Sequence, residues 1–252
     1  MAYIAEMARK SEVARTRVRR AANNVASPAA RKRSAPRGSR ASEATPYHHG
    51  ALHDALLEAA ERVLERDGLA GLTLRAVARE AGVSHAAPTH HFGDLTGLVS
   101  ELAAIGFRQF NDAMAAAGSI GGSGLEKAIA RAKAYVTYAQ VHPGMYGLMF
   151  RTERLDMTRP SLHEAATASF EGLASSVGAG RHERLTGEAL ETLTLDQAAA
   201  IARNWSLVHG FTMLLLDGRL KDILHRLPAG TSPEQLLNAM MLAAVAPRPS
   251  GA

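Results

Sequence analysis

The chain contains no cysteine and no long apolar run, and aromatic residues make up only 5% of it. Without cysteine there can be no disulfide framework, no thiolate metal site and no thiol nucleophile. This fits a reducing compartment, and we expect the protein in the cytoplasm. Since no run of about 18 apolar residues is present, we predict no membrane span and no membrane partner.

Positive charge is concentrated near one end of the sequence. Residues 1–46 hold eleven Lys and Arg against three acidic residues, a net charge of +8, whereas the rest holds 18 against 21, a net charge of −3. This arm has few large apolar residues and cannot offset its ordering entropy by burial, so we predict that it is disordered. Its expected partner is a polyanion, whose phosphates release counterions on contact. The alternatives are a solvated tail or a true translation start further downstream.

Every secondary-structure element predicted after this arm is helical, so the expected fold class is all-α. No segment of convincing length alternates with a period of two, and there is no internal repeat. Apolar residues at helical spacing predict helices over 51–67, 95–114, 125–139, 162–177, 196–216 and 232–244. A short apolar segment is expected at 145–150, loops at 118–124 and 178–194, and a disordered tail at 246–252.

Between the first two of these helices, Thr73 to Phe92 is predicted to form two short helices joined by a tight turn. The first helix has one apolar face, made by Leu74, Val77, Ala78 and Ala81. Gly82 can turn the backbone where this helix ends, and Ser84 can cap a second helix from His85 to His91. That second helix tolerates Pro88 near its first turn and has no row of large apolar residues, so its surface suits a DNA major groove.

Several motifs keep a fixed spacing around this turn. They are an apolar helix ending in Asp67-Gly68, the Thr73-Leu74 start, Val77-Ala78, the Ala81-Gly82-Val83-Ser84 turn, and His91-Phe92 before a new helix. In these motifs the chain from about Tyr47 to Leu102 resembles the DNA-binding domain of TetR/AcrR-type transcriptional regulators. Further along, WSLVHG at Trp205 to Gly210 resembles the Trp-His-Gly signature of one C-terminal domain type found in these regulators.

The resemblance implies a domain organisation and a function. A three-helix helix-turn-helix head would cover residues 47–98, with its helix-turn-helix at 73–92, and a helical effector-binding and dimerisation domain would cover 99–245. The implied function is that of a repressor, released from a palindromic double-stranded DNA operator by a small apolar or aromatic ligand. It would act as a homodimer, lie on the nucleoid when bound, and have neither enzymatic activity nor a cofactor.

Operator contacts are expected on the two short helices. We expect base contacts from Arg75, Ser84, His85, Ala86, Ala87, Thr89 and His90, and phosphate contacts from Thr73 and His91. Ala86 or Ala87 could meet a thymine methyl. The family usually has an aromatic residue at the position of Thr89 and a lysine near Leu95, and both commonly touch phosphates. This chain therefore departs from the family pattern at two backbone contacts.

The second half of the chain is expected to hold an effector pocket and a dimer interface. Aromatic and methionine side chains line adaptable apolar pockets, although each can also fill an ordinary core. The candidate pocket residues are Phe107, Phe110, Tyr135, Tyr138, Met145, Tyr146, Met149, Phe150, Phe170, Trp205 and His209. Helices 196–216 and 232–244 are apolar over more than one face, as expected if they also pack against a second subunit.

Two other classes of function compete with a DNA-binding regulator. An enzyme using Ser206 or His209 is disfavoured, because no nucleophile elbow, carboxylate pair or metal cluster accompanies them. His49 and His53 lie four residues apart, but no third ligand is present, so we predict no metal site. The remaining alternative is a helical protein–protein interaction scaffold whose DNA head is weakened by Thr89 and Leu95.

Overall fold

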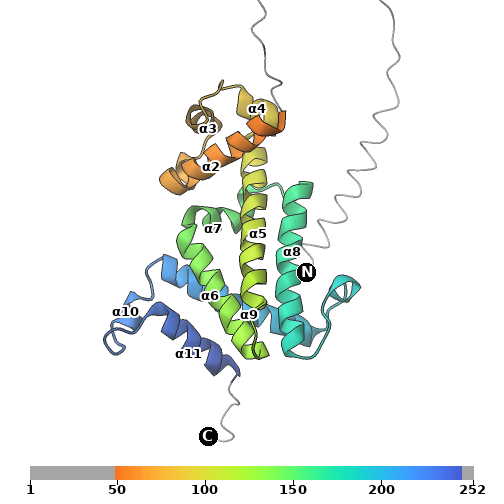
Figure 1. The fold of residues 1–252 in the computed structure, drawn as a ribbon, viewed down its shortest axis with the longest axis vertical. Helices are drawn as coiled ribbons and strands as arrows, with labels where there is room; N and C mark the ends of the chain where they lie inside the picture. Colours follow the sequence, from red (N-terminus) through yellow and green to blue (C-terminus); the bar gives the residue numbers. More distant parts are fainter. Residues whose placement is uncertain (1–48, 246–252) are drawn as a thin grey trace, which may run out of the picture. The chain divides into compact units, whose positions relative to one another are not determined.

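A computed structural model describes residues 49–245 of the chain (Figure 1). The predicted arm at 1–46 and the predicted tail at 246–252 lie outside the described residues. By its internal contacts the chain divides into units 1–56 and 57–252, which are described separately. Of the first unit, only the opening turns of its one described helix fall within the description, so the architecture below is that of the second unit.

The described residues are helical throughout, and no strand occurs among residues 49–245, which confirms the all-α fold class. The α-helices are α2 (His49–Gly71), α3 (Leu74–Glu80), α4 (Ala87–Phe92), α5 (Leu95–Gly118), α6 (Gly124–Val141), α7 (Pro143–Met149), α8 (Pro160–Gly180), α9 (Leu195–Leu216), α10 (Lys221–Leu224) and α11 (Pro233–Val245). Two short 3-10 helices, η1 (Thr152–Arg154) and η2 (Gly187–Leu190), lie in the connections. Within this part of the chain, none of the helices is both long and apolar enough to cross a bilayer.

The helix-turn-helix forms for local reasons. Thr73 caps α3, because its hydroxyl oxygen accepts a hydrogen bond from the backbone N–H of Ala76 at 3.1 Å. Gly82 has a φ of +67°, and the N–H groups of Gly82 and Val83 donate to the carbonyls of Arg79 and Ala78 at the end of α3. This pair of bonds is a Schellman motif, which needs a residue that tolerates positive φ at the position of Gly82.

The second helix begins later than its sequence predicts. It runs from Ala87 to Phe92, and Ser84 is not its N-cap. The Ser84 hydroxyl oxygen instead accepts from the backbone N–H of Ala86 at 3.2 Å, which makes a turn before the helix. A short polar side chain that bonds two residues ahead competes with helix formation, so the first turn of α4 is delayed.

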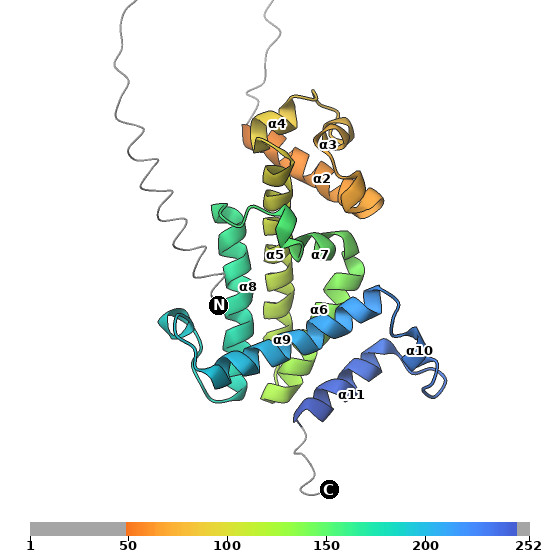
Figure 2. The same cartoon turned by 180° about the vertical axis from the view of Figure 1, so that it is seen from behind.

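Helix α5 is the central element of the following domain (Figures 1 and 2). Helices α6 and α8 pack along it, and α9 contacts both of them. One apolar cluster joins α6, α9 and α11 through Val136, Phe211, Leu237 and neighbouring residues. A second cluster joins α8 and α9 to the loop between them.

Three connections differ from the sequence-based expectation. The short apolar segment near 145–150 is a true helix, α7, with Pro143 in its first turn. The loop expected at 178–194 starts only after α8 ends at Gly180, and its Leu185 is 2% exposed within the α8–α9 cluster. The four-residue helix α10 was not expected, since it is too short to show a helical period.

Candidate DNA-binding surface and effector site

The residues expected to contact DNA lie on the surface of α3, α4 and the turn between them. Seven are exposed and two are half-buried; the half-buried ones are Ala87 and His91. The inward side of α4 is instead provided by Pro88 and Phe92, which are buried. Helix α4 therefore has a buried side and an exposed side, and the exposed side carries the side chains expected to contact base edges.

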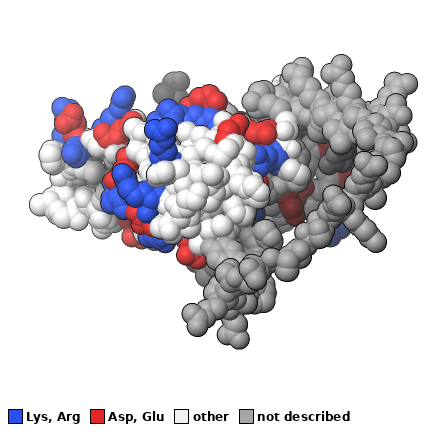
Figure 3. All heavy atoms as spheres, turned by 90° about the horizontal axis from the view of Figure 1, so that it is seen from above, with Lys and Arg blue, Asp and Glu red and all other residues white. Residues whose placement is uncertain are grey.

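The part of this surface formed by the turn and α4 has no formal charge other than that of histidine. From Ala81 to Ser100 the sequence contains a single charged residue other than histidine, Asp94, which caps α5 through a 2.8 Å bond from the Gly97 N–H. Figure 3, which looks onto this end, shows acidic and basic side chains next to one another around an uncharged area. Cationic contacts to a phosphate backbone must therefore come from outside α4.

An acidic residue at the edge of this surface is held by two arginines. Glu80 at the end of α3 accepts hydrogen bonds from Arg62 at 3.1 Å and from Arg66 at 2.9 Å, both on α2. The bonds from Arg66 and then Arg62 lower the pKa of the Glu80 carboxyl. The ion pairs anchor α3 to α2 and partly neutralise a charge that would repel phosphate.

The expected effector residues come together in one place, with one exception. Ring contacts link eight of them into an aromatic cluster made of Phe107, Phe110, Tyr135, Tyr138, Tyr146, Phe150, Trp205 and His209. The ring centroids of Phe150 and His209 lie 4.8 Å apart, and those of Phe110 and Tyr135 lie 5.0 Å apart. These are the offset and edge-on distances that aromatic pairs prefer.

Two methionines of α7 complete this cluster, and Phe170 stands apart from it. The Tyr138 hydroxyl donates to the Gly106 carbonyl at 3.0 Å and lies 3.8 Å from the sulfur of Met149. A Cβ at Gly106 would lie 2.7 Å from the sulfur of Met145, so α5 and α7 pack closely at this position. Phe170 belongs to the α8–α9 cluster, where it packs against residues such as Leu185.

A polar group lies inside the aromatic cluster. The hydroxyl oxygens of Tyr135 and Tyr146 are each 2.9 Å from Nδ1 of His209 and 3.2 Å from one another. Burial lowers the pKa of His209, so its imidazole favours the neutral form. If Nδ1 is the unprotonated nitrogen of the neutral ring, it can only accept. The two tyrosine hydroxyls then supply two hydrogens for three close contacts, so one of these contacts is not a hydrogen bond. We call this group the Tyr–Tyr–His triangle.

Burial also keeps the tyrosines of the cluster protonated. It raises the pKa of Tyr135 to about 12, although hydrogen bonds with Tyr146 and Trp205 act in the other direction. The pKa values of Tyr138 and Tyr146 are raised, again mainly by burial. Thr212 is fully buried, its hydroxyl donates to the Val208 carbonyl at 2.8 Å, and it acts against the raised pKa of Tyr146. It was missed in the sequence because threonine in an apolar helix carries no distinctive signal. The triangle therefore offers uncharged hydrogen-bonding groups only.

Two family descriptions match this chain. Residues 56–102 match "Bacterial regulatory proteins, tetR family", and residues 128–243 match "Tetracyclin repressor-like, C-terminal domain". The chain belongs to the TetR family. It is thus a TetR-type transcriptional regulator, and because this family consists of DNA-binding proteins that are not enzymes, the prediction of no enzymatic activity is confirmed.

Solved structures agree with TetR membership. A Rhodococcus sp. RHA1 protein described as having unknown function is 31% identical, with 79% of this chain and 95% of that chain covered and a TM-score of 0.63. A tetR-family regulatory protein from Rhodococcus RHA1 is 16% identical, with 77% and 94% covered and a TM-score of 0.52. The TetR family regulator PfmR from Thermus thermophilus is 18% identical, with 74% and 94% covered and a TM-score of 0.50. A search of the curated proteins found no match.

Large apolar side chains remain exposed on the last helices of this TetR chain. On α9 they include Trp205, which is 46% exposed, and Met213, Leu214 and Leu216; on α11, Leu242 is exposed. Trp205 also contacts His209, so it connects the aromatic cluster to this open face. Groups of exposed large apolar residues mark interaction surfaces.

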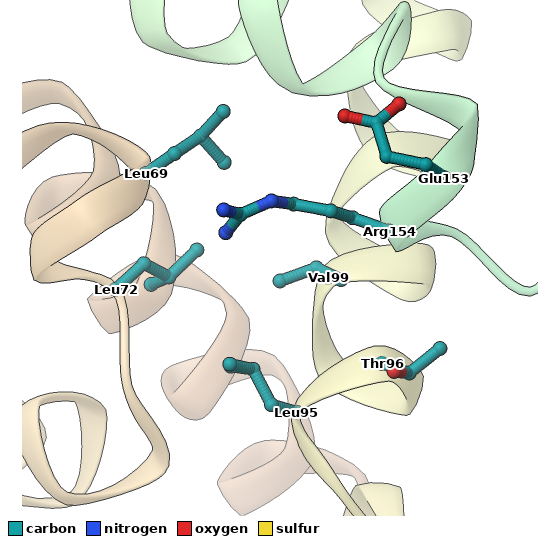
Figure 4. Close-up of a pocket in the computed structure, with 7 residues that line it drawn as sticks. All are labelled: Leu69, Leu72, Leu95, Thr96, Val99, Glu153 and Arg154. Atoms are coloured by element: carbon teal, nitrogen blue, oxygen red, sulfur yellow. The ribbon is translucent and has the colours of Figure 1, made fainter.

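A small cleft lies between the end of α2, the start of α5 and η1 (Figure 4). It has a volume of about 230 Å³ and is lined by Leu69, Leu72, Leu95, Thr96, Val99, Glu153 and Arg154. Leu95 thus extends an apolar wall at a place where the family usually has a lysine. Arg154 reaches from η1 toward Leu69 and Leu72. Among the residues whose side chains are described, no group of three His, Asp or Glu residues could hold a metal ion.

Proposed function

We propose that this TetR-type regulator is a repressor that binds a palindromic operator as a homodimer and releases it when a small apolar or aromatic ligand binds. The observation that carries the proposal is the aromatic cluster, which surrounds the Tyr–Tyr–His triangle and reaches the surface at Trp205. A domain that only dimerises does not need such a centre, because an apolar core of the same size is more stable than one with polar groups.

DNA binding is proposed for the nine residues on α3, α4 and the turn. Ala86 and Ala87 lie at the start of α4, where small side chains let the helix approach a thymine methyl closely. Arg75 is a cation on α3 with an exposed side chain facing away from the buried Val77 and Ala78. The Thr73 hydroxyl oxygen accepts its capping bond, so its hydrogen can still be donated to a phosphate.

Dimerisation is proposed through α9 and α11. Covering Trp205, Leu214 and Leu242 with a second copy would remove apolar area from water, which stabilises association by roughly 25 cal/mol per Å². A symmetric dimer would place two copies of α4 about 34–36 Å apart, one helical turn of DNA, and so select a palindrome.

The effector is proposed to be an uncharged molecule with an aromatic or apolar body and one hydrogen-bonding group. Its polar group would hydrogen-bond to the Tyr–Tyr–His triangle, and its body would displace rings near Trp205. No Lys, Arg, Asp or Glu belongs to the cluster, so a charged ligand would be desolvated without compensation.

Selection of bound sequences from a random DNA pool tests the proposal. Full-length protein and a version starting at Thr45 should both enrich one palindromic consensus, and the shorter version should show a smaller loss of affinity with added salt, because fewer phosphate contacts are released. If neither version enriches a sequence, the regulator proposal fails and the scaffold alternative, which the departures at Thr89 and Leu95 favour, takes its place.

A further inference from the structure

The connection between α7 and α8, residues 150–159, and the first turn of α8 are bonded directly to α4 and α5. The backbone N–H of Asp156 donates to the Ser100 hydroxyl at 2.8 Å, and the Ser161 hydroxyl donates to Glu101 at 2.8 Å. The guanidinium of Arg159 donates through Nη2 to the carbonyl of Phe92 at 3.1 Å and lies 3.4 Å from Glu101 through Nη1. These bonds fasten the connection to the first turns of α5 and to the last residue of α4.

The Phe92 carbonyl is a distinctive target for an arginine. It belongs to the last turn of α4, whose carbonyls have no partner inside the helix and form the negative end of its dipole. A guanidinium at this end forms a charge-assisted hydrogen bond, which is stronger than a neutral one. Arg159 is 31% exposed on its side chain, so solvent screens the bond only in part.

Gly97 keeps the approach open. A Cβ at this position would overlap both the Phe92 carbonyl oxygen and Nη2 of Arg159. Gly97 is also buried in the first turn of α5, next to the N-cap Asp94. The Arg159 guanidinium can therefore reach the Phe92 carbonyl only because residue 97, in the first turn of α5, is glycine.

The same connection begins in the aromatic cluster. Phe150 is its first residue, with ring centroids 4.9 Å from Tyr146 and 4.8 Å from His209. At the other end of α7, the Glu65 carboxylate of α2 accepts from the backbone N–H of Met145 at 3.0 Å. Helix α7 and the connection thus touch the head at both ends, while their middle faces the proposed effector site.

We propose that Arg159 is a positioning residue for operator binding, which fixes the C-terminal end of recognition helix α4 to the effector domain independently of the covalent link through α5. This rests on the proposed function. A ligand that displaces Phe150 would pull on residues 151–159 and change how tightly Arg159 holds Phe92. Coupling through such a contact requires two arrangements with different affinities for DNA.

The guanidinium has a third partner within reach, besides Phe92 and Glu101. Its Nε atom is buried and has no hydrogen-bond partner among the described residues, and it lies 3.9 Å from Oδ2 of Asp156. The other carboxylate oxygen of Asp156 accepts from Thr158, so Oδ2 is available. A shift of about 1 Å would bring Nε and Oδ2 to hydrogen-bonding distance. Arg159 would then turn from Phe92 toward Asp156.

The test compares full-length wild-type protein with Arg159→Gln, Arg159→Lys and the control Arg151→Gln. Arg151 lies in the same connection, is exposed, and among the described residues forms an ion pair only with Glu153, at 3.9 Å. We measure amide hydrogen exchange over residues 90–98 without DNA, and affinity for the selected operator and for unrelated DNA. Arg159→Gln should speed exchange in this segment and weaken operator binding on the order of ten-fold, with unrelated DNA bound as before.

Arg159→Lys, which keeps the charge, should recover part of both losses, and Arg151→Gln should match wild type. Unchanged exchange and operator affinity in Arg159→Gln would overturn the proposal while leaving the regulator function intact. An equal loss of specific and unspecific binding, with lysine giving no recovery, would assign Arg159 a merely structural role and also overturn it. Failure of wild type to select any operator would instead remove the proposed function itself.

Discussion

The DNA-binding surface and the aromatic cluster are built on opposite principles. The nine side chains of the DNA-binding surface are small or polar, and seven of them are exposed. In the cluster the side chains are large and mostly buried, and their polar atoms bond to one another, as in the Tyr–Tyr–His triangle. The side chains of the first region are accessible to a partner molecule, whereas those of the second mainly contact one another.

This difference separates stability from recognition. An exposed side chain with few partners contributes little to the free energy of folding, so its replacement can change binding without changing stability. A buried aromatic residue contributes several kcal/mol to folding, so any role in ligand binding is added to a structural role. Substitutions in the two regions should therefore differ in which measurement they change.

The largest effect is expected for Tyr146→Ala. Tyr146 is 1% exposed, contacts Tyr135, Phe150 and His209, and shares the triangle. Its removal should lower the free energy of unfolding by about 3–5 kcal/mol, measured by urea denaturation. Protein concentration must be held fixed, since the proposed dimerisation would add to apparent stability.

Tyr146→Phe is the matched control, because it removes only the hydroxyl. It should cost about 0.5–1.5 kcal/mol, the net contribution of ordinary hydrogen bonds. If Tyr146→Ala unfolds at the same urea concentration as wild type, the cluster is not a structural core, and the contrast between the two regions disappears.

The helix-turn-helix could be predicted from the sequence because its determinants are local. Thr73 caps the helix that begins one residue later, and Gly82 ends it by adopting positive φ within a few positions. Such signals act over one or two turns and are visible in the residue order. The delayed start of α4 was missed because Ser84 can either cap a helix or close a turn, and both choices use the same hydroxyl.

The contacts that join the two regions could not be predicted, since they are not local. Arg159 meets Phe92 across 67 positions of sequence, and Glu65 meets Met145 across 80. Nothing in the composition near Arg159 distinguishes it from Arg154, which has no such partner. The membership of the aromatic cluster was predicted by residue type, but type alone also included Phe170, which α8 directs into another cluster.

A smaller effect is expected for Arg75→Ala, and it should appear in operator affinity and not in stability. This exposed residue of α3 should contribute about 1–3 kcal/mol to operator affinity if it contacts a base, with unfolding changed by less than about 0.5 kcal/mol. Titration of the selected operator and of a scrambled one measures it. Arg108→Ala, an equally exposed change on α5, is the control and should leave the ratio of the two affinities unaltered. An equal loss on both DNAs would make Arg75 a phosphate contact.

The smallest effect is the pH dependence that His209 confers on stability. Because burial lowers its pKa below the ordinary value of 6.5, the unfolded chain takes up a proton at a higher pH than the folded protein does. The stability contributed by neutral His209 is therefore complete above pH 6.5 and is lost as the pH falls toward the lowered folded value.

The difference in unfolding free energy between wild type and His209→Gln isolates this contribution, because the other histidines titrate in both proteins. The unfolding free energy of wild type minus that of His209→Gln should be constant from pH 8 to about 7. It should then decrease steadily as the pH falls further. A difference that stays constant down to pH 5 would mean that His209 is as well solvated in the folded protein as in the unfolded chain. The triangle would then have to be open to water, as the DNA-binding surface is.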